Sequence, residues 1–140
     1  MLYFDTSAIV PVFMNDAHTR IIESWMATQI ERFVVSEFAA AEFAAVVSRR
    51  FRMRHLSRID ADHVLADFDK WHLMVERQET RSFDVSGAAR LVRDFELSLA
   101  VPDAIHLAIA IAEGTPLVTF DNRLADASRK LKHPVVVPQA

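Results

Sequence analysis

The chain has 140 residues, of which 51% are hydrophobic, and its 16 Lys and Arg against 19 Asp and Glu give a formal net charge of −3. This size and composition predict one domain over residues 1–140 with a single core, and the acidic balance argues against a surface that binds nucleic acid over its whole area. Two glycines are too few for the phosphate-cradling loops of nucleotide-cofactor enzymes, and the absence of cysteine excludes disulfides and thiolate metal sites.

In the first half of the chain, short strands alternate with helices. The apolar run Leu2–Phe4 predicts a strand, and the polar residues that follow it predict a turn into a helix. Farther on, apolar residues recur at helical spacing, and a second β-branched run leads into an alanine-rich segment. The expected elements are a helix over 16–30 capped by Asp16, a strand over 33–35, a helix capped by Ser36 that ends near Arg52, and an antiparallel partner helix over roughly 58–74.

The second half continues the alternation. Pro102 marks the start of a helix, and Gly114 marks its end. The expected elements are a strand within 75–83, a helix opened by Asp84 or Ser86, the helix that starts at Pro102, a strand over 116–120, a helix over 122–132 and a strand over 134–137. This order predicts an α/β fold of three layers, in which helices flank a parallel sheet of four to five short strands.

The sequence offers no sign of a membrane protein. No apolar stretch is long enough to cross a bilayer, and the amino terminus lacks the basic segment that opens a signal peptide. The lack of cysteine fits a reducing compartment. We therefore expect a soluble, cytoplasmic protein without a membrane partner.

Four acidic residues lie inside apolar segments or at their ends. Asp5 and Asp121 each follow an apolar strand, and Asp103 opens an apolar helix. Glu42 is surrounded at helical spacing by Phe, Ala and Val side chains only. A carboxylate among buried apolar residues is costly unless something positive meets it. Because the carboxyl ends of parallel strands share one rim, we expect Asp5 and Asp121 to lie together.

The environments of the other two acids differ. Asp103 falls in the first turn of its helix, where the helix dipole favours an ionised carboxylate. An uncompensated Glu42 would have a raised pKa, whereas a bound metal would keep it ionised. Several carboxylates that converge repel one another, and Mg²⁺ or Mn²⁺ is the cation that suits an all-oxygen ligand set. The chemistry that such a site supports is metal-assisted hydrolysis of a phosphodiester bond.

These residues stand in stretches that resemble the PIN-domain ribonucleases, most closely the VapC-type toxins of type II toxin–antitoxin systems. The resemblance covers essentially the full chain and is carried by Leu2–Ala8, Ser36–Glu42, Val101–Ala108 and Leu117–Asp121. It implies a PIN-like fold and an endoribonuclease in which the catalytic, Mg²⁺- or Mn²⁺-binding residues are Asp5, Glu42, Asp103 and Asp121. It also implies an RNA substrate, a cognate VapB-like antitoxin that inhibits the enzyme, and a homodimer.

In this interpretation, other polar residues lie next to the four metal-binding acids without binding the metal themselves. Ser7 and Thr119 are similar to the hydroxyl residues that the family keeps beside its acids, and Asp126 is a candidate outer carboxylate. His106 is expected to be a packing residue, because the family mechanism uses metal-bound water rather than a histidine base.

A basic cluster stands at the end of the alanine-rich helix, with no acidic residue among its members. In one interpretation it is a solvated helix end, where Arg complements the helix dipole. In the other it is a surface that contacts RNA or the antitoxin. The candidate contact residues are Arg49, Arg50, Arg52 and Arg54.

The sequence leaves two alternative functions. An Asp-dependent phosphatase or phosphoreceiver fits poorly: the phosphatase needs a second Asp where Ser7 stands, and the phosphoreceiver needs adjacent acids where Thr6 follows Asp5. A catalytically inactive PIN fold that serves only as a binding scaffold is disfavoured by the intact set of acids, but it stays open.

Overall fold

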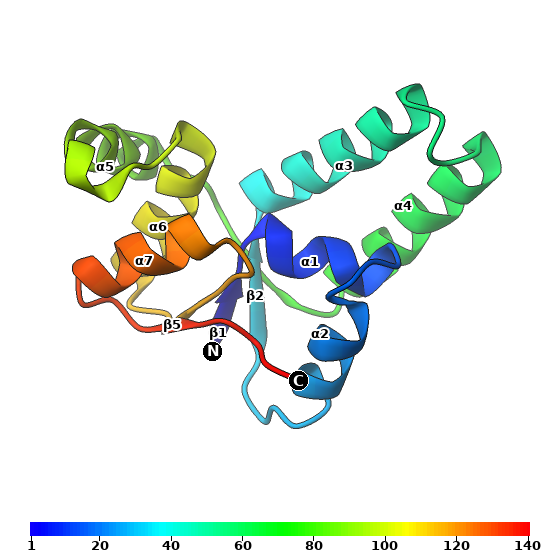
Figure 1. The fold of residues 1–140 in the computed structure, drawn as a ribbon, viewed down its shortest axis with the longest axis horizontal. Helices are drawn as coiled ribbons and strands as arrows, with labels where there is room; N and C mark the ends of the chain where they lie inside the picture. The colour runs from blue at the N-terminus through cyan, green and yellow to red at the C-terminus, as the bar shows by residue number, and fades with distance from the viewer.

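The computed structural model describes residues 1–140 and shows a five-stranded sheet between two layers of helices (Figure 1). All neighbouring strands are parallel, in the order β3-β2-β1-β4-β5. The strands are β1 (Leu2–Phe4), β2 (Phe33–Ser36), β3 (Glu76–Gln78), β4 (Leu117–Val118) and β5 (Val135–Val136). The predicted three-layer α/β architecture is confirmed.

Helices cover both faces of the sheet (Figure 1). One face carries α1 (Thr6–Phe13), α2 (Thr19–Met26), α3 (Glu37–Arg52) and α4 (Arg58–His72). The other carries α5 (Ser82–Arg93), α6 (Val101–Glu113) and α7 (Asn122–Lys130), with a short 3₁₀ turn at Phe95–Leu97. As predicted, α3 and α4 form a helical hairpin, which projects away from the sheet. None of the helices combines the length and the apolar character that a bilayer crossing needs.

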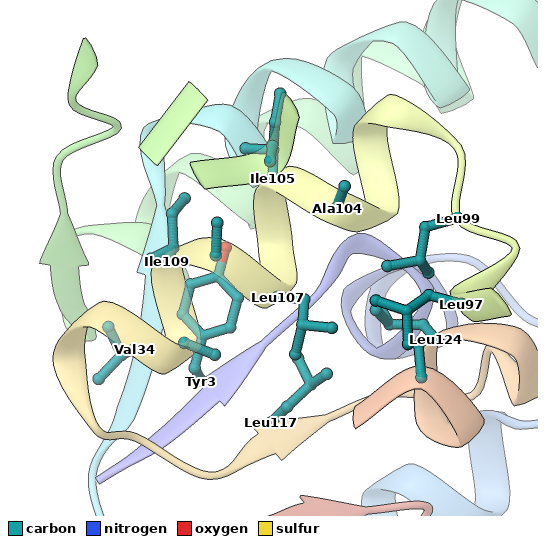
Figure 2. Close-up of a cluster of buried hydrophobic side chains, with 14 residues drawn as sticks. Tyr3, Val34, Leu97, Leu99, Ala104, Ile105, Leu107, Ile109, Leu117 and Leu124 are labelled. Atoms are coloured by element: carbon teal, nitrogen blue, oxygen red, sulfur yellow. The ribbon is translucent and has the colours of Figure 1, made fainter. Parts of the chain in front are cut away.

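The side chains of the strands belong to two separate hydrophobic cores, one on each face of the sheet. From β1, Tyr3 enters the core beneath α5–α7, whereas Leu2 and Phe4 enter the core beneath α1–α4. Figure 2 shows the first of these cores, where Leu107 of α6 packs near Leu117 of β4. Successive side chains of a strand point to opposite faces, so a strand covered on both faces is apolar throughout. This burial explains why the central strands were recognisable as apolar runs.

The second helix is shorter than the sequence predicts. It begins at Thr19 and ends at Met26, rather than spanning 16–30. The Asp16 carboxylate accepts a hydrogen bond from the N–H of His18 at 2.7 Å and so closes a local turn before the helix. Asp side chains often bond neighbouring backbone in this way, which competes with helix formation.

The helix expected to open at Asp84 or Ser86 begins earlier, at Ser82. Asp84 is the third residue of α5, and its carboxylate accepts the backbone N–H of Arg81 at 2.8 Å. This is the return bond of a capping box, so the acid marks the first turn rather than the start. The predicted end of the helix that starts at Pro102 is confirmed. Gly114 ends α6 with a left-handed φ of 63°, a conformation that glycine adopts without strain.

The order of the strands reverses between β1 and β4. From β1 the chain passes outward to β2 and β3 through α1–α4, and it then crosses to β4 and β5 through α5–α7 on the opposite face. In doubly wound parallel sheets, ligands bind in the crevice that such a reversal opens beyond the carboxyl ends of the strands. The ends of β1 and β4 are therefore the place where this fold predicts a site.

Candidate active site

Asp5 and Asp121 follow the two central strands at this crevice. Phe4 of β1 pairs in parallel with Val118 of β4, so the chain leaves both strands at the same rim. Each aspartate also caps the next helix. The Asp5 carboxylate accepts the N–H of Ala8 at 3.1 Å, and that of Asp121 accepts two N–H groups from the first turn of α7. The two acids thus share one rim, as the sequence predicted.

Asp103 and Glu42 approach the same crevice from the two helical layers. Asp103 lies in the first turn of α6, and Glu42 lies on α3. Burial and the negative charges of Asp121, Asp5 and Glu42 raise the pKa of Asp103 to about 6. The pKa of Asp103 thus responds to each of the other three acids, although they are far apart in the sequence.

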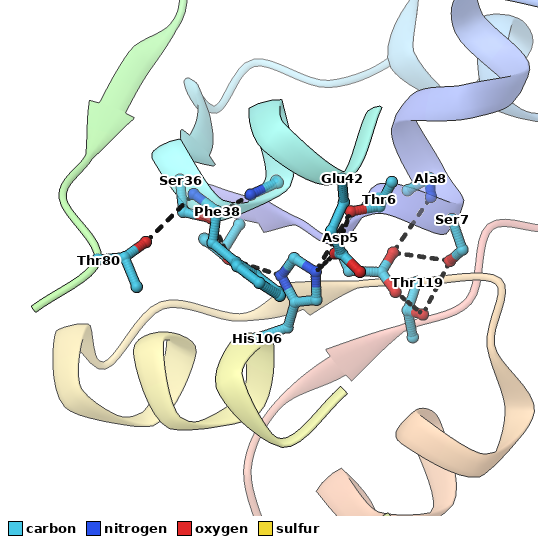
Figure 3. A network of polar contacts seen from close by, with 12 residues as sticks. Asp5, Thr6, Ser7, Ala8, Ser36, Phe38, Glu42, Thr80, His106 and Thr119 are labelled. Carbon is cyan, nitrogen blue, oxygen red and sulfur yellow. Dashed lines mark hydrogen bonds and ion pairs between the residues drawn. The ribbon is translucent and has the colours of Figure 1, made fainter. Parts of the chain in front are cut away.

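Asp5 is the innermost of the four acids. It is 3% exposed, whereas the other three are only partly buried. Its oxygens accept hydrogen bonds from the hydroxyls of Ser7 at 2.7 Å and Thr119 at 2.8 Å (Figure 3). Burial nevertheless raises the pKa of Asp5, although these donors and nearby His106 act in the opposite direction. An ionised Asp5 is therefore costly, and a positive partner would stabilise it.

Ser7 and Thr119 also join the ends of β1 and β4. Ser7 Oγ accepts the N–H of Phe120 at 2.9 Å, and Thr119 Oγ1 accepts the N–H of Asp121 at 2.9 Å. The two hydroxyl oxygens are 3.2 Å apart. The structure therefore places both residues directly beside the acids, where they orient Asp5 and fix the segment that carries Asp121.

His106 contacts Glu42, so the interpretation of this histidine as a packing residue is incomplete. Its Nε2 lies 2.5 Å from Glu42 Oε1, and the Thr6 hydroxyl donates to the same oxygen at 2.6 Å. Burial acts to raise the pKa of Glu42, but these hydrogen bonds outweigh it and bring the pKa below its usual value. The raised pKa expected for an uncompensated Glu42 is thus not found, because His106 and Thr6 compensate it. A polar residue one helical turn after Asp103, in an otherwise apolar helix, was the available signal.

Tyr3 in turn fixes the ring of His106. The Tyr3 hydroxyl lies 2.8 Å from His106 Nδ1 and 2.8 Å from Ser36 Oγ. Burial raises the pKa of Tyr3, so its hydroxyl keeps the proton. A Tyr3 hydroxyl that donates to Nδ1 leaves the imidazole proton on Nε2, where it is donated to Glu42. Hydrogen bonds therefore connect Ser36, through Tyr3 and His106, to Glu42 on α3.

Two sets of predicted site residues lie away from these contacts. Asp126 is exposed on α7 and pairs with Arg129 at 3.0 Å, and it makes no hydrogen bond to the four acids. The arginine cluster stands at the end of α3 and in the turn after it, at the outer tip of the hairpin (Figure 1). At 1.5 Å per residue of helix, Arg52 lies about 15 Å beyond Glu42 along the axis of α3.

The donor set suits a hard divalent cation. All four side chains offer oxygen, the ligand atom that Mg²⁺ and Mn²⁺ prefer, and three of them reach solvent. No group of three or more acidic or histidine side chains stands in metal-binding geometry. The reason is local: Asp5 and Asp121 direct oxygens to helix N–H groups, and Glu42 directs one to His106. The second oxygen of Glu42 accepts no hydrogen bond, so an ion held here would require a different orientation of the aspartate carboxylates only.

The sequence matches the PIN domain family over residues 2–130, and the chain belongs to that family. It is 31% identical to ribonuclease VapC46 of Mycobacterium tuberculosis over 98% of this chain and 97% of that protein. It is 28% identical to ribonuclease VapC35 of the same organism over 99% of this chain and 97% of that protein. A chain of a toxin–antitoxin complex from Klebsiella pneumoniae has the same fold, with a TM-score of 0.71 and 17% identity over 99% of this chain and 98% of that chain. The family suggested by the sequence is confirmed.

Removing the charge of Asp103 should stabilise the metal-free protein. The folded protein binds the Asp103 proton more tightly than the unfolded chain, with a pKa of about 6 against an ordinary 3.8, so stability falls as the pH rises through that window. Asp103→Asn should raise the free energy of unfolding by about 1–2 kcal/mol near pH 8, after discounting for solvent screening and for the lost helix-dipole contact.

Urea denaturation in EDTA, at about pH 8 and about pH 4, measures this effect, and the gain should disappear at the lower pH because the carboxyl is then protonated. Asp94→Asn, which changes an exposed Asp at the end of α5, is the matched control. An Asp103→Asn variant less stable than the wild type near pH 8 would contradict the repulsion described here.

Proposed function

We propose that this chain is a metal-dependent endoribonuclease of the VapC toxin type, which hydrolyses RNA phosphodiester bonds and is inhibited by a cognate antitoxin. The observation that carries the proposal is the gathering of four acids at the switch point of the sheet, where burial and the charges of the other three acids raise the pKa of Asp103 to about 6. Perturbed titratable groups in a crevice are typical of functional sites. Both relatives named above are called ribonucleases, which supports the same assignment.

Mg²⁺ or Mn²⁺ would be held by Asp5, Asp103 and Asp121, with Glu42 completing the set. A divalent cation bound there supplies Lewis-acid chemistry, because it lowers the pKa of the attacking water and neutralises charge on the phosphate. Its positive charge also relieves the repulsion that raises the pKa of Asp103.

The remaining residues of the crevice orient the acids. Ser7 and Thr119 hold both oxygens of the buried Asp5. Thr6 and His106 bind Glu42 Oε1 and keep this carboxylate ionised, while its second oxygen accepts no hydrogen bond from the protein. Since water is the attacking group, the 2′-hydroxyl of RNA takes no part in the reaction, and preference for RNA must come from contacts to its shape and bases.

The partners of this function are a VapB-like antitoxin and a second copy of the chain. The structural neighbour from Klebsiella pneumoniae comes from a toxin–antitoxin complex, and we extend that partnership to this protein.

A PIN fold that only binds is the alternative function, and the intact set of four acids argues against it. A binding scaffold would need the acids only as surface charge. The two functions differ in what a divalent metal does, and the following experiment separates them.

Purified protein should cleave RNA in Mg²⁺ or Mn²⁺ and stop when EDTA is added. Asp5→Asn and Asp121→Asn should each lower the cleavage rate by about 100-fold or more, because each removes a ligand oxygen and a charge from the proposed metal site. Time courses on end-labelled RNA measure the rate, and Asp94→Asn is the control for an Asp to Asn change outside the crevice.

Activity that persists in EDTA, or in Asp5→Asn, would refute the proposed metal site. A wild-type protein that binds RNA or antitoxin but cleaves nothing in either metal would favour the binding scaffold.

Charge reversal at the tip of the α3–α4 hairpin should weaken partner binding and leave metal binding unchanged. Arg50 and His55 line a hollow between α1 and the hairpin, and Arg54 stands in the turn. Arg50→Glu and Arg54→Glu should each lower the affinity for RNA or for antitoxin by about tenfold at low salt, since each reverses a charge that would face an anionic partner.

Fluorescence anisotropy measures both affinities, and calorimetry with Mn²⁺ measures metal binding. Arg93→Glu on α5 is the matched control. If neither affinity changes in the hairpin variants, the cluster is a solvated helix end with no binding role.

A further inference from the structure

His18 and Phe120 form an aromatic stack beside the acidic crevice. Their ring centroids lie 4.1 Å apart and their planes differ by 15°. The next closest pair, Phe43 with Phe68 at 4.3 Å, lies in the core. His18 is exposed, whereas every other ring in such a pair is buried or partly buried. This stack is therefore the one that includes an exposed residue.

The segment before α2 holds His18 in place. Its N–H donates to the Asp16 carboxylate at 2.7 Å, and Asp16 in turn donates its N–H to Thr19 Oγ1 at 2.9 Å. The Thr19 hydroxyl is anchored on the carbonyl of Pro11 at 2.8 Å. His18 occupies the N-cap position of α2 but makes no side-chain cap, and its hydrogen bonds run through the backbone alone. The ring is thus positioned while both of its nitrogens stay free.

Phe120 connects the stack to the acids. Its backbone N–H donates to Ser7 Oγ at 2.9 Å, and the Ser7 hydroxyl donates to Asp5. The next residue is Asp121, whose Cα is one peptide unit, about 3.8 Å, from that of Phe120. The Phe120 ring packs against the core beneath α1–α4 and stacks against His18. The stack is therefore built on the same segment that positions two of the four acids.

We propose that the outer face of His18 binds one unpaired nucleobase of the RNA, next to the phosphodiester bond that is cut. The inference rests on the proposed nuclease function and adds a substrate subsite to it. Aromatic and imidazole rings hold single-stranded bases by stacking, whereas a paired base is stacked between its neighbours and unavailable. The free ring nitrogens can bond to the edge of a base or to a phosphate. The outer face of His18, the stacking platform, therefore selects RNA in which the base beside the cut is unpaired.

A double-mutant cycle between protein and RNA tests the platform. The substrate is a hairpin RNA that the wild type cleaves in its loop, with single abasic nucleotides placed in turn on either side of the cut. His18→Ala should lower kcat/KM on intact RNA roughly 5- to 150-fold, the effect of losing one base stack. His18→Phe keeps a flat ring and should retain most of the activity.

The decisive comparison combines His18→Ala with an abasic nucleotide in the RNA. At one position the abasic nucleotide should lower kcat/KM of the wild type by a similar factor and cause no further loss in His18→Ala, because the stack is already absent. His63→Ala, which removes an exposed histidine of α4, is the control for loss of an imidazole elsewhere. Equal cleavage of intact RNA by the wild type and His18→Ala, or losses that multiply at every position, would overturn the proposal.

A binding measurement separates failure of the platform from failure of the nuclease. Single-stranded RNA that carries 2-aminopurine should be quenched by the wild type and by His18→Phe, and less by His18→Ala. Quenching that depends on His18 without any cleavage would support the platform and refute the nuclease function. Cleavage without quenching that depends on His18 would refute the platform and leave the nuclease function intact.

Discussion

The burial of carboxylates close to one another at the ends of β1 and β4 governs the chemistry of the site. The reversal of strand order places Asp5 and Asp121 side by side, and helices on opposite faces bring Glu42 and Asp103 to them. Burial raises the pKa of Asp5, and burial together with the charges of the other three acids raises the pKa of Asp103 to about 6. A fold loses stability by gathering like charges in this way, so the arrangement indicates a function that uses them.

The protein compensates the four charges unequally. Around Asp5, two hydroxyls and a helix N–H supply hydrogen bonds, and Glu42 receives bonds from His106 and Thr6. For Asp103, burial and repulsion dominate, and its pKa of about 6 is the result. Glu42 is therefore ionised at neutral pH without help from a metal, whereas Asp5 and Asp103, whose pKa values are raised, are the acids that a cation would stabilise in their ionised form. Because Glu42 is already held and ionised, a cation would bind mainly to the aspartates, and Glu42 would orient it.

Features of the site that follow from local sequence were predictable, and those that depend on distant contacts were not. Because apolar strands precede them, Asp5 and Asp121 could be placed on one rim from the sequence alone. The bond between His106 and Glu42 could not be foreseen, since it joins residues 64 positions apart and needs a tyrosine from β1 to orient the imidazole. Likewise, Asp16 matches the pattern of a helix cap, but its carboxylate closes a turn instead, so α2 starts later than predicted.

If the four acids act as one metal site, anomalous diffraction from crystals grown with Mn²⁺ should reveal the ion. We expect an anomalous peak in the crevice, within bonding distance of oxygens from Asp5, Asp103 and Asp121, with Glu42 still bound to His106. We also expect the aspartate carboxylates to rotate away from their present geometry, in which no three acidic side chains could hold an ion. No peak at the crevice at saturating Mn²⁺, or a peak held by other residues, would contradict a metal site made by these acids.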